Sequence, residues 1–65
     1  MKTRGKALAE KYGNVWIFDG TGVWWCNDGI RYVMRENDGY WLYGYGQGEP
    51  RRIWFNEKGD VEDVT

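Results

Sequence analysis

The sequence contains no histidine and no serine, one cysteine and one proline. Without histidine or serine the chain cannot form a Ser-His-Asp or Cys-His catalytic arrangement, and it lacks the most common protein ligand of zinc. Three aspartates, Asp19, Asp28 and Asp38, each precede a glycine, as is usual for aspartates that form local hydrogen bonds in turns. We therefore predict a protein that is not an enzyme and that binds no cofactor and no metal.

The single cysteine also bears on the cellular setting. Cys26 cannot form a disulfide within the chain, and no stretch has the apolar run of a signal peptide or of a membrane span. We expect a cytoplasmic protein without membrane contact. Free cysteine packs as a small hydrophobic side chain, so Cys26 is predicted to be buried, and the alternatives are a reactive thiol and intermolecular pairing.

The charges are balanced overall and separated along the chain. The formal net charge is −1 at pH 7. Residues 1–12 hold four basic side chains against one acidic side chain, whereas residues 56–65 hold four acidic side chains against one basic side chain. A strongly basic surface for phosphate contacts is absent, which disfavours nucleic acid as a partner.

Aromatic residues are abundant for the size of the chain. The 65 residues include five Trp, five Tyr and two Phe. A chain of this length is near the lower limit for a single hydrophobic core, and large aromatic side chains supply the most apolar area per residue. We predict one domain comprising all 65 residues.

The first 13 residues have the pattern of a short helix. Good helix formers occupy positions 6–11, Thr3 can serve as the N-cap, and Gly13 stands where a helix commonly ends. The apolar stripe is thin, consisting mainly of Leu8 and Tyr12, and Gly5 weakens the helix further. Such a helix must dock on the rest of the domain to persist.

From residue 14 onward, short β-favouring runs alternate with turn residues. The stretch 39–46 has an aromatic residue at every second position from Trp41 to Tyr45, which is typical of a strand with two different faces. The connections are too short for parallel crossovers. The prediction is a mainly β fold, an antiparallel meander of five or six short strands over residues 14–65, curled or closed as an SH3-like small barrel, with one N-terminal helix. The residues identify no known family.

Two Asn-Asp-Gly turns and one four-residue turn predict the strand register. Three-residue turns at Asn-Asp-Gly would pair Cys26 with Ile30 and Met34 with Leu42, and a four-residue loop would pair Phe18 with Val23. One resulting face carries only apolar and aromatic side chains and is predicted to be the core: Val15, Ile17, Trp24, Cys26, Ile30, Tyr32, Met34, Tyr40 and Leu42. Gly44 and Gly46 continue this face, where a neighbour can approach closely.

The opposite face of this predicted sheet interleaves arginines with aromatic residues. Trp, Tyr and Arg are the residue types enriched in binding hot spots. We therefore predict a recognition surface whose binding residues are Trp16, Trp25, Arg31, Arg35, Trp41, Tyr43 and Tyr45.

Three functions are compatible with that surface, beside a purely structural role in which aromatic pairs and arginine stems stabilise the sheet. The first is binding to a protein partner as a small inhibitor or adaptor of a larger complex, of the kind encoded by phages and other mobile elements. The second is single-stranded nucleic-acid binding by base stacking. The third is a homodimer or larger homo-oligomer with a structural role.

Overall fold

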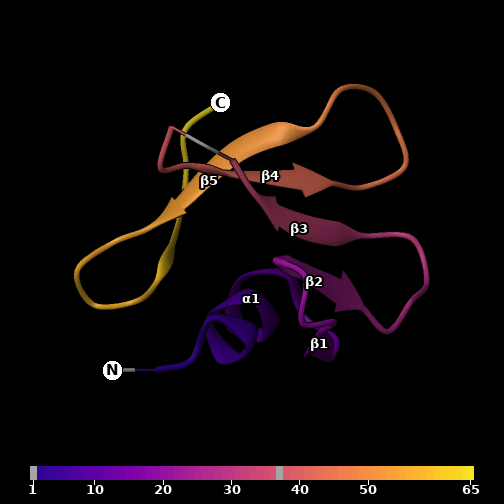
Figure 1. The fold of residues 1–65 in the computed structure, drawn as a ribbon, viewed down its shortest axis with the longest axis horizontal. Helices are drawn as coiled ribbons and strands as arrows, with labels where there is room; N and C mark the ends of the chain where they lie inside the picture. The colour runs from indigo at the N-terminus through magenta and orange to yellow at the C-terminus, as the bar shows by residue number, and fades with distance from the viewer. Residues whose placement is uncertain (1, 37) are drawn as a thin grey trace.

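The computed structural model describes residues 2–36 and 38–65 of the chain (Figure 1). Its elements are, in chain order, α1 (Arg4–Tyr12), β1 (Trp16–Phe18), β2 (Val23–Cys26), β3 (Tyr32–Arg35), β4 (Trp41–Gly44), β5 (Arg51–Phe55) and β6 (Val61–Asp63).

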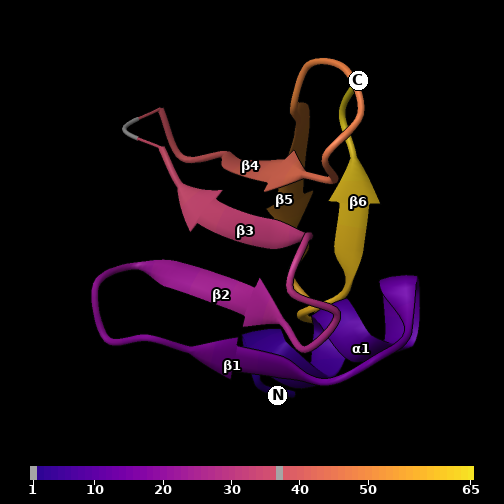
Figure 2. The same cartoon turned by 90° about the vertical axis from the view of Figure 1, so that its right-hand side faces the viewer.

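The six strands form one antiparallel sheet in the order β1-β2-β3-β4-β5-β6. In Figure 2, β1 to β4 run across the view, whereas β5 and β6 run in a clearly different direction, so the sheet is twisted along its length. It remains open, because β1 and β6 each pair with one neighbour only. The predicted meander with an N-terminal helix is confirmed, in its curled form and not as a closed barrel.

Helix α1 has the ends that the sequence predicts. The Thr3 side chain accepts a hydrogen bond from the Lys6 backbone N–H, and the Gly13 N–H donates to the carbonyl of Ala9. The helix packs against both β1 and β6, and buries Leu8 completely. It thereby covers one face of the sheet, which we call the inner face.

Gly5 has a role that the sequence does not reveal. A Cβ atom at this position would lie 2.7 Å from the ring of Trp24. The absence of a side chain therefore allows α1 to approach β2 closely. The loss in helix propensity is the cost of this contact.

The predicted register is confirmed in one hairpin and wrong by one residue in the other two. Met34 does lie opposite Leu42. Phe18 pairs with Trp24 and not with Val23. The Asp19 N–H donates to the Val23 carbonyl, so the loop between β1 and β2 is one residue shorter than predicted.

The second hairpin has a longer loop than predicted. Cys26 donates its N–H to the carbonyl of Arg31, so the loop has four residues, 27–30. The carboxylate of Asp28 accepts the backbone N–H groups of Ile30 and Arg31, which satisfies these donors within the loop.

The two slips decide which side chains face the helix. One slip lies in the hairpin before β2 and the other in the hairpin after it. Strand β2 therefore keeps its predicted face, whereas β1, β3 and β4 present the opposite side chains to the helix. The buried cluster is formed by Leu8, Trp16, Cys26, Val33, Trp41, Tyr43 and Ile53. Burial of Cys26 is as predicted, whereas Val15, Ile17 and Ile30 of the predicted core are exposed.

The two glycines expected to admit close neighbours do so. A Cβ at Gly44 would lie 2.3 Å from the ring of Tyr32, its cross-strand partner, and one at Gly46 would lie 2.8 Å from a methyl group of Ile30. These contacts occur on the outer face of the sheet, opposite to the helix.

We expect Gly44→Ala to lower the free energy of unfolding by about 1–3 kcal/mol, because the added methyl group overlaps the ring of Tyr32. In a Tyr32→Ala background the same substitution should cost much less. Urea unfolding of the four proteins of this double-mutant cycle measures the difference. An equal cost in both backgrounds would contradict the observed contact.

Candidate functional site

The predicted recognition surface is largely the core of the protein. Trp16, Trp41 and Tyr43 are only 5%, 6% and 9% exposed, respectively. The register slips turn them to the inner face, where α1 covers them. The prediction that these three residues form an open surface is therefore wrong.

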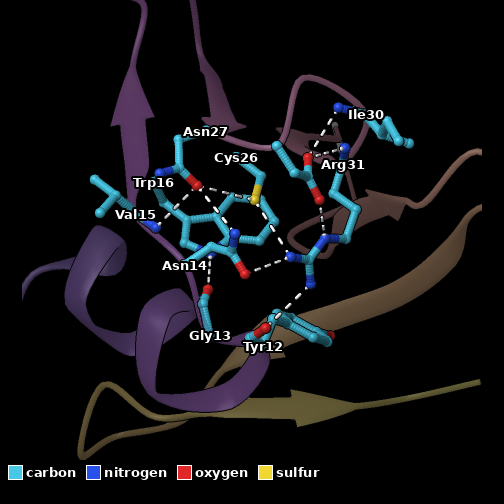
Figure 3. Close-up of polar contacts among 10 residues, drawn as sticks. Tyr12, Gly13, Asn14, Val15, Trp16, Cys26, Asn27, Ile30 and Arg31 are labelled. Carbon is cyan, nitrogen blue, oxygen red and sulfur yellow. Dashed lines mark hydrogen bonds and ion pairs between the residues drawn. The ribbon is translucent and has the colours of Figure 1, made fainter.

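Arg31 is engaged within the protein (Figure 3). Its guanidinium donates to Asp28 at 2.6 Å, to the carbonyl of Tyr12 at 3.1 Å and to the side chain of Asn14 at 2.9 Å. It also lies over the ring of Trp16. These bonds connect the end of α1 to the loop between β2 and β3.

The same cluster stabilises a carboxylate. Backbone N–H groups of Ile30 and Arg31, together with the Arg31 guanidinium, hold the pKa of Asp28 well below its usual range. These contacts join two parts of the fold, and they occupy most of the N–H groups with which Arg31 could bind a ligand.

The remaining predicted binding residues are separated. Tyr45 stacks on Tyr43 at a centroid distance of 5.8 Å and is partly buried. Arg35 is exposed at the end of β3, beside Trp41. Trp25 is 45% exposed and lies on the outer face. The seven residues therefore do not form one surface.

The open surface of the protein is the outer face of the sheet. Its side chains are mostly apolar or aromatic, together with the charged Arg52 and Glu62: Ile17, Val23, Trp25, Tyr32, Met34, Tyr40, Leu42, Arg52, Trp54 and Glu62. The helix lies on the opposite side. Half of these residues were predicted to be core, and Arg52, Trp54 and Glu62 were assigned to neither face.

Both exposed tryptophans on the outer face are held in place by carboxylates. The indole N–H of Trp25 donates to Asp19 at 2.9 Å, and that of Trp54 donates to Glu62 at 2.6 Å. Each ring thus has its polar atom satisfied while about half of the side chain remains open to water. The carboxylates therefore fix the orientation of both rings.

Asp19 is itself strongly stabilised as a carboxylate. Hydrogen bonds from the Thr21 hydroxyl and backbone, and then from the Trp25 indole, lower the pKa of Asp19 to about 2. Asp19 therefore connects the first turn to the orientation of Trp25.

The outer face has a hollow at β4 and β5. The hollow has a volume of about 700 Å³ and is lined by Tyr40, Leu42, Glu49, Pro50, Arg52 and Thr65. The Arg52 guanidinium lies 5.1 Å from the ring centroid of Tyr40. Among residues 2–36 and 38–65, Arg52 forms no ion pair.

Comparison with protein-family models, curated proteins and solved structures finds no match to this chain. In the described part of the chain, no helix is long and apolar enough to span a membrane. The same residues contain no group of three His, Cys, Asp or Glu side chains that could hold a metal ion.

Substitutions of two tryptophans should distinguish the two faces. We expect Trp16→Ala to lower the free energy of unfolding by about 3–5 kcal/mol, because it opens a cavity in the core. Trp25→Ala should cost about 1 kcal/mol, the size of an aromatic cross-strand pair. Chemical unfolding followed by far-UV circular dichroism measures both, and equal costs would contradict the assignment of faces.

Stability should also depend on the ionisation of Asp19. The folded state lowers the pKa of Asp19, so its contribution is complete above the unfolded value of about 3.9 and is lost as the pH falls toward about 2. Asp19→Asn should therefore destabilise the protein at pH 5, with a difference from wild type that shrinks toward pH 2.

Urea unfolding at several pH values tests this expectation. Glu57→Gln is the control, because Glu57 is exposed and makes no side-chain hydrogen bond or ion pair with another described residue. A difference between Asp19→Asn and wild type that stays constant from pH 5 to pH 2 would show that the carboxylate charge has no such role.

Proposed function

We propose that this protein is a non-enzymatic binding module that engages a protein partner through the outer face of its sheet. The observation that supports this most is the pair of carboxylate-anchored tryptophans, Trp25 and Trp54, on a face that no element of the described residues covers. An exposed apolar surface of this kind commonly marks an interaction site in a small soluble domain.

The chemistry of the face favours a protein surface as its occupant. Rigid aromatic rings provide large contact area with little loss of side-chain entropy on binding. Arg52 offers a guanidinium without a carboxylate partner among the described residues, beside the hollow at Tyr40. The matching partner has an apolar patch with an acidic side chain that pairs with Arg52.

The biological role in this proposal is that of an inhibitor or adaptor. A domain of 65 residues with no histidine or serine is suited to covering a site on a larger complex, as small proteins of phages and mobile elements do. A cytoplasmic setting belongs to the same proposal.

Affinity capture with matched variants tests the proposal. The double variant Trp25→Ala/Trp54→Ala should weaken binding of the captured protein at least tenfold, since hot-spot tryptophans commonly contribute about 2 kcal/mol or more each. Phe18→Ala is the control, because Phe18 is similarly exposed but belongs to the inner face.

Two results would contradict the proposal. One is a partner that binds the double tryptophan variant as tightly as wild type. The other is a wild-type protein with twice the monomer mass in light scattering and a double variant that is monomeric, which would assign the outer face to a homodimer.

A further inference from the structure

A second groove lies at the end of the inner face that the helix leaves open. It has a volume of about 350 Å³ and is lined by Arg4, Phe18, Gly22, Trp24, Arg35 and Trp41. These residues come from the start of α1, the β1–β2 hairpin, β3 and β4. The groove is separate from the outer face, because the sheet lies between them.

Two positively charged side chains line this groove. The guanidinium carbons of Arg4 and Arg35 lie 5.2 Å and 5.7 Å, respectively, from the ring centroid of Trp41. None of the described residues that line the groove is acidic. In the part of the chain that the structure describes, neither arginine forms an ion pair.

Of the other basic residues, only Lys2, Lys11 and Arg31 form ion pairs in the described part of the chain, and Lys6, Arg51, Arg52 and Lys58 form none. Arg31 is paired with Asp28, Lys2 with Glu10 and Asp60. Arg4 also stands in the first turn of α1, which contains no acidic residue, where a positive charge is unfavourable to the helix dipole. Arg4 and Arg35 differ from the other unpaired basic residues because both line one groove beside the ring of Trp41. An anionic ligand in this groove would supply a counter-charge to both.

The aromatic side chains that line the groove indicate which class of anionic ligand fits it. Phe18 and Trp24 pack at a centroid distance of 5.1 Å, and Phe18 is about half exposed. A planar ring can stack on such side chains. A phosphate monoester carries a charge of about −1.5 to −2 at pH 7, which matches two guanidiniums better than the single charge of a carboxylate.

We propose that this groove binds a phosphate monoester attached to a planar base, that is, a nucleoside monophosphate unit. The phosphate lies between Arg4 and Arg35, and the base stacks against Phe18 and Trp24. The unit arrives either as a free nucleotide or as the 5′-phosphate end of a single strand. Both sources present the same chemistry to the groove.

Titrations of the full chain followed by amide NMR shifts test the proposal. Adenosine 5′-monophosphate should bind at least about tenfold more tightly than adenosine, because a charge-assisted contact contributes that much. The amides of Gly22, Arg35 and Trp41 should shift, whereas those of Asp28 and Arg52 should not. Inorganic phosphate should compete, and added salt should weaken binding.

Variants supply a matched comparison. Arg4→Gln and Arg35→Gln should each weaken binding of the nucleotide about tenfold. Arg52→Gln should change it less than about twofold. Arg52 also stacks on an aromatic ring and has no ion pair with a described residue, but it lies on the outer face. Circular dichroism confirms that each variant is folded.

The source of the ligand is decided by one further comparison. A 5′-phosphorylated trinucleotide that binds more tightly than the mononucleotide supports a strand end, and one that binds more weakly supports a free nucleotide. The proposal is overturned if adenosine binds as well as its monophosphate, if neither arginine variant loses affinity, or if no shift occurs at about 5 mM nucleotide.

Discussion

One nine-residue helix can cover only one face of a six-stranded sheet, and the rest of the structure follows from this constraint. The side chains under α1 form the core, and Gly5 lets the helix backbone approach the ring of Trp24 closely enough to seal it. Among the described residues, no second helix is present to cover the other face. The outer face therefore remains in contact with water although many of its side chains are apolar.

The exposed aromatic residues are nevertheless ordered by polar contacts. Carboxylates of Asp19 and Glu62 hold the indoles of Trp25 and Trp54, and the ring of Tyr32 lies over Gly44. Such contacts satisfy the polar atoms of the tryptophans and fix the rings without a covering layer. A surface prepared in this way loses little side-chain entropy when a partner binds, which is the physical basis of the proposed function.

The arginines of the protein have three different environments. The guanidinium of Arg31 forms hydrogen bonds that join the end of α1 to the sheet, as Figure 3 shows. Arg52 lies on the outer face over Tyr40, and Arg4 and Arg35 lie beside Trp41 in a groove without acidic residues. The amino-acid composition alone does not distinguish these arginines from one another. Their positions separate the structural role of Arg31 from the two places at which binding is proposed.

Local patterns in the sequence were sufficient to predict the helix and the strands of this fold. Thr3 and Gly13 mark the ends of the helix, short connections require antiparallel neighbours, and alternation around Trp41 indicates a two-faced strand. The pairing of Met34 with Leu42 and the close approach at Gly44 also followed from sequence. These features depend on residues near one another in the chain.

The choice of faces was decided by the tertiary structure. Side chains alternate with a period of two, so a change of one residue in loop length inverts a whole strand. Asp19 and Asp28 form the local hydrogen bonds expected of them, but the loop lengths that accompany these bonds were not evident from the turn residues alone. Sequence thus determined which residues form strands, whereas loop geometry and helix docking determined which of the aromatic residues became core and which remained available for binding.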